Sequence, residues 1–243
     1  MSGTNIKAKS DKRVLGVLGG MGPLASAEFL RTIYEYSLGQ REQESPIVFL
    51  YSDPTIPDRT EALLRGDHDT LINGLTESLS RLFDFGVSKI VICCVTAHYL
   101  LEKLPVHLSQ RVISLLDVIF AQLAKSPERH LLVCTNGTRQ LKIFQNHPSW
   151  EMLKDYVVLP NQADQDLIHR EIIYGIKNNR RLSQANDLLE LLLERYDVES
   201  FIAGCTEMHL VAKQFVAAEI NQTRFRCLDP LTLLAKDIVK EGI

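Results

Sequence analysis

Two cysteines stand at matching points in two copies of one sequence pattern. In each copy an apolar run leads to a cysteine, Cys94 or Cys205, and a histidine follows four residues later, His98 or His209. The pKa of a free thiol is about 8.5, and a position at the amino end of a helix lowers it. A cysteine in that position can be a thiolate near neutral pH and act as a base or a nucleophile.

The ordinary interpretation of a single cysteine is a small hydrophobic side chain buried in the core. Cys93, Cys134 and Cys227 lie in or beside apolar runs, and we interpret them in this way. Cys94 and Cys205 differ because both occupy the same point of a repeated unit. The repeat favours a functional role for these two thiols.

The same two cysteines and two histidines offer a second interpretation, because Cys94, His98, Cys205 and His209 are residue types that bind zinc. Their spacing is a weaker zinc signal than a pair of closely spaced cysteines, and the two halves come from distant segments. We therefore expect no metal, and expect each histidine to pack or form hydrogen bonds behind the site.

The elements around Cys94 explain how a thiol would be positioned. Ile90–Ile92 is apolar and β-branched, which is typical of a central parallel strand, and a helix is expected at Ala97–Lys103. Cys94 then lies between the carboxyl end of a strand and the amino end of a helix. Open α/β sheets bind their ligands at this place.

Predicted strands and helices alternate along the whole chain, which indicates mainly parallel sheets. Further strands are expected at Val14–Leu18, Ile47–Tyr51, Val112–Leu116, Leu131–Cys134, Tyr156–Leu159 and Arg224–Leu228. Further helices are expected at Leu24–Leu38, Asp67–Phe85, Asp164–Lys177, Leu182–Tyr196 and Pro230–Lys240, with two more that end near Lys125 and at Gln145. Asp229 is expected to cap the last helix.

The repeat predicts an α/β fold of two pseudo-symmetric domains, each a mainly parallel sheet flanked by helices. The N-terminal domain is expected at residues 14–115, joined by residues 225–243, and the C-terminal domain at residues 116–224. Residues 1–12 are expected to form a flexible tail. The active site would lie in the cleft between the domains, with one cysteine on each wall.

Composition excludes several classes of protein. The chain has 243 residues, of which 45% are hydrophobic and 23% charged, so it can build a substantial core. A net charge of −3 without a basic run gives no support for binding nucleic acid, and no apolar segment is long enough to cross a membrane. Five cysteines, an odd number, do not indicate a secreted disulfide framework, and a reducing cytoplasm is expected.

Other polar groups lie beside the predicted strand ends. Gly19–Gly22 follows the first strand and exposes N–H groups suited to an anion, although a tight turn would explain it equally well. Arg59 follows a loop fixed by two prolines and is suited to hold a carboxylate, although a lone arginine is usually a solvated surface charge. Lys177 is expected at a helix end, where a cation is favourable to the helix dipole.

The residues that follow the two thiols are the last candidates. Thr96, Thr206 and Glu207 stand where the start of a helix would meet a substrate carboxylate, and Glu207 could accept a hydrogen bond from an ammonium group. The alternative is that these residues only cap helices.

Four motifs together resemble the aspartate/glutamate racemase family, and the resemblance runs over about Val14 to Lys240. They are Leu18–Gly22, Ile56–Thr60, Cys94–His98 and Gly204–Glu207. The resemblance is greatest to the aspartate branch that works without a cofactor. It implies a two-domain α/β fold, a homodimer, L- and D-aspartate as the small-molecule substrate, and racemisation without pyridoxal phosphate or metal.

The resemblance also implies residue roles. Cys94 and Cys205 match the family's two catalytic cysteines, Arg59 matches the arginine that meets the side-chain carboxylate of aspartate, and Lys177 matches the lysine paired with it. The segments that wrap the substrate contain Met21, Thr96, Thr135, Asn136, Thr206 and Glu207. The family usually has asparagine where this chain has Val95. Glu207 replaces the histidine of glutamate racemases, which favours the aspartate branch.

Two thiols on opposite walls suit racemisation, because the carbanion is planar and one base cannot easily serve both faces. One cysteine as thiolate would remove the α-proton, and the other as thiol would return a proton. Other functions stay open at this point. They are a decarboxylase or cis–trans isomerase that uses one cysteine, a protein that only binds acidic amino acids, and a zinc-structured interaction module.

Overall fold

The computed structural model describes residues 14–38, 41–178, 182–219 and 225–241, and the predicted tail at residues 1–12 lies outside them. Two four-stranded sheets form the framework, with strand orders β2-β1-β3-β4 and β6-β5-β7-β8. The first comprises β1 (Val14–Gly19), β2 (Ile47–Ser52), β3 (Lys89–Ile92) and β4 (Val112–Ile113). The second comprises β5 (His130–Cys134), β6 (Val157–Val158), β7 (Ser200–Gly204) and β8 (Arg226–Leu228).

Both sheets are built in the same way, which confirms the predicted pseudo-symmetry. All strand pairs in the described part of the chain are parallel, and in each sheet the first strand of the chain pairs with the second and the third. The strands β3 and β7 therefore occupy equivalent positions. They are the strands that lead to Cys94 and Cys205.

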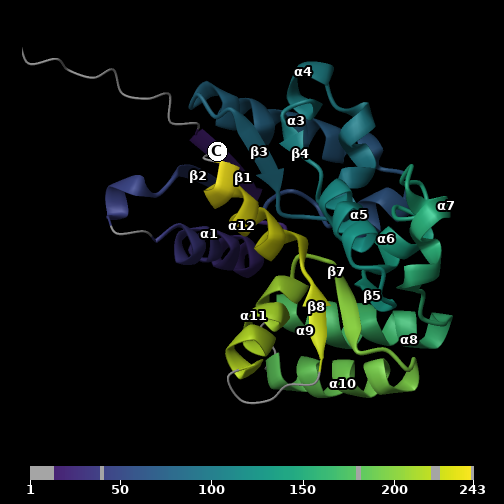
Figure 1. Cartoon of the computed structure of the whole chain (residues 1–243). Helices are drawn as coiled ribbons and strands as arrows, with labels where there is room; N and C mark the ends of the chain where they lie inside the picture. The colour runs from purple at the N-terminus through teal and green to yellow at the C-terminus, as the bar shows by residue number, and fades with distance from the viewer. Residues whose placement is uncertain (1–13, 39–40, 179–181, 220–224, 242–243) are drawn as a thin grey trace, which may run out of the picture.

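Helices cover both sheets (Figure 1). In the first half they are α1 (Pro23–Ser37), α2 (Arg59–Leu64), α3 (His68–Asp84), α4 (Val106–Ser109) and α5 (Leu115–Lys125). In the second half they are α6 (Asn136–Gln140), α7 (Trp150–Leu153), α8 (Gln162–Leu167), α9 (Tyr174–Lys177), α10 (Leu182–Arg195), α11 (Met208–Glu219) and α12 (Pro230–Glu241). Three short 3₁₀ helices lie at Glu42–Glu44, Thr96–Lys103 and Lys154–Tyr156. Among these described elements, no helix is both long and apolar enough to cross a membrane.

The last helix links the two halves. In Figure 1, α12 leaves β8 of the second sheet and runs back beside α1 of the first half. It packs against α1 and α5, and one core cluster contains apolar residues of both sheets, such as Leu15 of β1 and Ile202 of β7. Asp229 caps α12 as expected, because its carboxylate accepts the N–H groups of Leu231 and Thr232. The division of the chain at residue 116 stays a prediction.

Several predicted elements differ from those observed. The helix expected at Ala97–Lys103 is a 3₁₀ helix, and the helix expected to reach Gln145 ends at Gln140, before turns that include Lys142 at φ 52°. The strand expected to end at Leu116 stops at Ile113, because Ser114 caps α5 by accepting the N–H of Asp117.

The predicted helix Asp164–Lys177 contains a π-helical segment, Ile168–Ile173, between α8 and α9. A π-helical turn adds a residue to the helical repeat and is often found at functional sites. Here it directly precedes α9, the helix that contains Tyr174 and Lys177. The strand expected at Arg224–Leu228 is observed from Arg226, and Arg224 lies outside the described residues.

Candidate active site

The two thiols lie where the repeat predicts them, at the carboxyl ends of β3 and β7. Cys94 is 7% exposed and Cys205 is 6% exposed. The N–H of Cys94 donates to the carbonyl oxygen of Ile92 at 2.7 Å, so the chain turns sharply as it leaves β3. The hydroxyl of Thr206 donates to the carbonyl oxygen of Cys93 at 3.1 Å. This bond ties the loop after one strand to the loop after the other.

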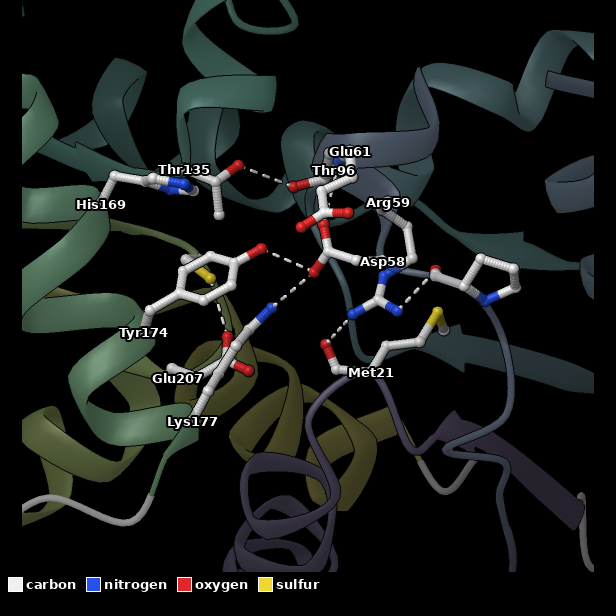
Figure 2. Close-up of polar contacts among 12 residues, drawn as sticks. Met21, Asp58, Arg59, Glu61, Thr96, Thr135, His169, Tyr174, Lys177 and Glu207 are labelled. Atoms are coloured by element: carbon white, nitrogen blue, oxygen red, sulfur yellow. Dashed lines mark hydrogen bonds and ion pairs between the residues drawn. The ribbon is translucent and has the colours of Figure 1, made fainter. Parts of the chain in front are cut away.

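The predicted threonines form a second link between the two halves. The Oγ1 of Thr96 lies 3.1 Å from the Oγ1 of Thr135 and 3.0 Å from that of Thr138 (Figure 2). Thr135 also caps α6 by accepting the N–H of Thr138. The backbone at Gly137 comes so close to Thr60 that an added Cβ would stand 2.8 Å from the Thr60 Oγ1. These contacts tie the loop that contains Cys94 and the start of α2 to the loop that follows β5.

Glu207 is the immediate partner of Cys205. The Cys205 Sγ donates to the Glu207 Oε2 at 2.7 Å, and the Glu207 Oε1 is buried without a protein partner among the described residues. Burial first and the Glu207 carboxylate second raise the pKa of Cys205 well above its ordinary value, so this sulfur is a thiol at neutral pH. The expectation that the start of a helix lowers the thiol pKa is thus wrong for Cys205, because desolvation and the neighbouring carboxylate dominate.

Arg59 is the first residue of α2, and it is only 7% exposed rather than a solvated surface charge. Its guanidinium donates to the carbonyl oxygens of Ile56, Pro57 and Met21 at 3.1, 2.9 and 2.8 Å. Its Nε is buried without a partner in the described chain. Burial acts to lower the pKa of Arg59, but its interactions with Cys94 and Asp58 outweigh burial, so the pKa is raised. Arg59 fixes the glycine-rich loop and keeps a free donor beside Cys94.

Lys177 meets two residues that sequence reasoning missed. Its Nζ lies 3.7 Å from the Asp58 Oδ2, and the Tyr174 hydroxyl donates to the same oxygen at 2.6 Å (Figure 2). Asp58 stands inside the Pro-Asp-Arg-Thr motif, and Tyr174 stands three residues before Lys177 on the same helix. These two positions, within the motif and one helical turn before Lys177, are the sequence signals that could have identified Asp58 and Tyr174 as site residues. The contact joins the two halves of the molecule across the site.

A cavity of about 300 Å³ collects several of the predicted residues. Its lining includes Met21, Arg59, Lys177 and Glu207 together with Gly20, Gly22, Asp58 and Ile176. Neither thiol lines this cavity. Glu207 hydrogen-bonds Cys205, however, and Arg59 interacts with Cys94. A Cβ at Gly22 would lie 2.5 Å from the Glu207 Oε1, so a larger residue there would force the Glu207 carboxylate to shift.

Asn136 lies apart from this cavity. Its Nδ2 donates to the Asp166 Oδ1 at 2.9 Å, and its Oδ1 accepts from the Gln165 Nε2 at 3.1 Å. Both ends of the amide are therefore bound by the protein, while the backbone N–H donates to His169 at 3.3 Å. A second cavity, of about 360 Å³, lies near the amino ends of β5 and β7 and contains none of the predicted site residues.

The two histidines are packed behind the thiols. Burial lowers the pKa of His98, whose neutral ring donates from Nδ1 to the Cys94 carbonyl oxygen at 2.9 Å and accepts the N–H of Leu115 at 3.0 Å. The His209 ring contacts the Asp229 Oδ2 at 2.6 Å and the Thr32 Oγ1 at 3.0 Å. All four ring nitrogens have protein partners, so the arrangement does not suit a zinc site and instead supports the loops that carry the thiols.

Val95, the departure from the family pattern, is fully buried in the core cluster that contains residues of both sheets. It offers the cavity no polar atom. The polar side chains available to a ligand come from the start of α2, from α9 and from Glu207.

The sequence as a whole matches one family of known proteins. A family model described as Asp/Glu/Hydantoin racemase matches residues 18–238. The broad specificity amino-acid racemase RacX of Bacillus subtilis (strain 168) is 22% identical over 240 residues, which cover 93% of this chain and 96% of that protein.

Solved structures share the fold. The aspartate racemase of Picrophilus torridus superposes with a TM-score of 0.78 at 24% identity, covering 95% of this chain and 94% of that one. A glutamate racemase from Francisella tularensis subsp. tularensis SCHU S4, in complex with D-glutamate, superposes with a TM-score of 0.65 at 14% identity, covering 95% and 81% of the two chains.

Proposed function

The chain belongs to the Asp/Glu/hydantoin racemase family, and we propose that it interconverts L- and D-aspartate by a two-base mechanism that uses Cys94 and Cys205 and no cofactor. The observation that carries the proposal is the equivalent placement of the two thiols, with a cavity beside them that contains Arg59 and Lys177. A homodimeric assembly and a cytoplasmic location stay predictions.

The protonation of Cys205 suggests which thiol acts first. Cys205 is a thiol at neutral pH, so in a two-base mechanism Cys205 serves first as the acid and Cys94 takes the role of the base. In one direction the Cys94 sulfur takes the α-proton and leaves a planar carbanion, and the Cys205 sulfhydryl gives its proton to the opposite face. This step leaves Cys94 as thiol and Cys205 as thiolate. The other enantiomer reacts from that second state.

The α-carbanion needs stabilisation, because the α-proton of an amino acid is very weakly acidic. Charge would develop on the α-carboxylate, and preorganised donors in a buried site are the usual way to stabilise it.

Binding of the other carboxylate, on the substrate side chain, is a separate task. The free Nε of Arg59 and the ammonium of Lys177 are the donors proposed to hold it, which places the α-carbon between the sulfurs. The unpartnered Glu207 Oε1 is suited to accept from the substrate ammonium.

Purified protein is expected to racemise L-aspartate after dialysis against a chelator and removal of any pyridoxal phosphate. The two sulfurs supply both proton transfers, so the reaction needs no added group. Circular dichroism of the L-aspartate solution, followed to equilibrium, measures the rate, and L-glutamate and L-alanine serve as comparison substrates. Activity that is lost on dialysis and restored only by metal or by pyridoxal phosphate would refute the proposal.

Glu207→Gln is expected to shift the pH dependence of racemisation to lower pH. Burial and the Glu207 charge both raise the pKa of Cys205, and glutamine keeps the size of the side chain but removes its charge. For the enantiomer whose proton Cys205 removes, kcat/KM rises as Cys205 ionises. For the other enantiomer, which needs Cys205 as the acid, kcat/KM falls over the same range. The rise of kcat/KM for one enantiomer and its fall for the other should therefore both shift to lower pH.

The measurement is kcat/KM for L- and D-aspartate separately, from about pH 6 to 10. Glu61→Gln removes a carboxylate from the exposed surface of α2, and its profile should match that of the unmodified protein. If the pH profiles of kcat/KM were unchanged in Glu207→Gln, the Glu207 carboxylate would not control the pKa of Cys205.

A further inference from the structure

We propose that Asp58 and Tyr174 together set how strongly the site selects a substrate with a side-chain carboxylate, by controlling how much of the Lys177 charge is left for the substrate. The inference rests on the proposed function and adds two specificity-determining residues to it. Neither residue is expected to take part in proton transfer.

The geometry at Asp58 shows a carboxylate that is held away from the lysine. Its Oδ1 accepts the N–H of Glu61 at 3.0 Å, because Asp58 caps α2. Its Oδ2 accepts the Tyr174 hydroxyl at 2.6 Å, whereas the Lys177 Nζ stays at 3.7 Å, longer than a hydrogen bond. The helix start and the phenol therefore bind both oxygens of Asp58, and the ammonium is left only partly neutralised.

Tyr174 contacts the lysine as well as the carboxylate. The Lys177 Nζ lies 4.8 Å from the centre of the Tyr174 ring, a distance typical of a cation–π contact. The ring and the hydroxyl therefore have separable roles: the ring supports the ammonium, and the hydroxyl restrains Asp58. Replacement by phenylalanine removes only the second role.

The restraint of Asp58 by Tyr174 is important for selectivity because of the charges around the cavity. Four ionisable side chains line it, the cations Arg59 and Lys177 and the acids Asp58 and Glu207. Their formal charges cancel, so the cavity offers no excess positive charge to a second carboxylate. Selectivity for such a substrate then depends on which acid holds which cation. In Figure 2 the Lys177 ammonium points toward Asp58.

The protonation states agree with this assignment. Burial acts to raise the pKa of Asp58, but the hydrogen bonds from Tyr174 and Glu61 and the charges of Lys177 and Arg59 outweigh it, so the pKa is lowered and Asp58 is an anion. Burial and the neighbouring Asp58 raise the pKa of Tyr174, which keeps its hydroxyl as a donor.

Two substitutions are expected to have opposite effects on aspartate binding. Asp58→Asn keeps the size of the side chain and an oxygen to cap α2 but removes one of the two carboxylate charges beside Lys177, the other being that of Glu207. L-Aspartate should bind on the order of tenfold more tightly, the size of one partly buried ion pair. Tyr174→Phe frees the Asp58 Oδ2 to close on Lys177, so L-aspartate should bind several-fold more weakly. L-Alanine, which has no side-chain carboxylate, should bind nearly equally to all forms.

Isothermal titration calorimetry of the purified full chain with L-aspartate and L-alanine measures these changes without requiring turnover. The double variant should resemble Asp58→Asn, because the phenol has no carboxylate left to restrain. Tyr196→Phe is the matched control, since it removes another tyrosine–aspartate hydrogen bond, to Asp164 at 2.8 Å, away from the cavity.

Opposite shifts for L-aspartate with no change for L-alanine would support the proposal. Shifts in the same direction, equal shifts for both ligands, or no shift at all would overturn it. A protein that binds L-aspartate with these shifts but does not racemise it would contradict the proposed function and leave the role of Asp58 and Tyr174 supported.

Discussion

Alanine in place of either Cys94 or Cys205 is expected to reduce aspartate racemisation to the background rate. In the proposed mechanism each thiol serves one face of the α-carbon, and neither face alone completes the reaction. The loss should exceed the roughly 10²- to 10⁴-fold contribution of a single positioned acid or base, because the substitution removes the only group on its side. Circular dichroism of L- and D-aspartate measures the loss.

The two variants should still differ in a second measurement, the exchange of the α-proton with deuterated solvent. The variant with Cys205→Ala keeps Cys94, which can remove and replace the proton of the enantiomer that faces it. The variant with Cys94→Ala should favour the other enantiomer. Proton NMR of each enantiomer in deuterium oxide follows the exchange, and a switch of the preferred enantiomer between the variants is the expected result.

Cys227→Ala is the control, because Cys227 lies on β8, away from the cavity that contains Arg59, and should leave turnover unchanged. Thermal unfolding of all variants shows whether the fold is intact. Full racemisation by either Cys94→Ala or Cys205→Ala would refute the two-base mechanism and favour a decarboxylase or isomerase type of reaction that needs one cysteine.

The framework of this site could be predicted because it depends on local patterns. The β-branched run before Cys94 and the matching run before Cys205 each form a strand, and the leucines of α3, Leu71, Leu75 and Leu79, are fully buried as their spacing predicts. A repeated strand and helix fix where the chain leaves each sheet. Two equivalent thiols therefore follow from sequence alone.

The electrostatics of the site could not be predicted in the same way, because they depend on contacts between distant segments. Asp58 and Tyr174 are 116 positions apart and meet in the folded chain, where a π-helical segment, Ile168–Ile173, directly precedes Tyr174. The raised pKa of Cys205 depends on complete burial beside Glu207, which outweighs the general effect of a helix start. The spacing of residues in the sequence gives neither the burial of Cys205 nor the distance between Asp58 and Tyr174.

Arg59→Leu is expected to have the second large effect, and the structure changes how the result must be interpreted. The sequence assigns Arg59 to the substrate carboxylate, but its guanidinium also donates to the carbonyl oxygens of Met21, Ile56 and Pro57. Loss of a charge-assisted hydrogen bond to the substrate costs about 1.5–3 kcal/mol, or about 10- to 150-fold in kcat/KM for aspartate. Leaving buried carbonyl groups without partners costs about 1–3 kcal/mol of stability in addition.

The loss of the substrate contact and the loss of stability can be distinguished by comparing substrates and variants. The stability effect lowers Tm and acts on every substrate alike, whereas loss of the carboxylate contact lowers kcat/KM for aspartate more than for alanine. Arg59→Lys keeps a positive charge beside Cys94 but cannot bond three carbonyls with one ammonium group. It should therefore lose stability while it retains part of the preference for aspartate. If Arg59→Leu turned over aspartate and alanine in the original ratio, Arg59 would be only a support for the loop at Met21, and Lys177 would be left as the cation that selects the substrate.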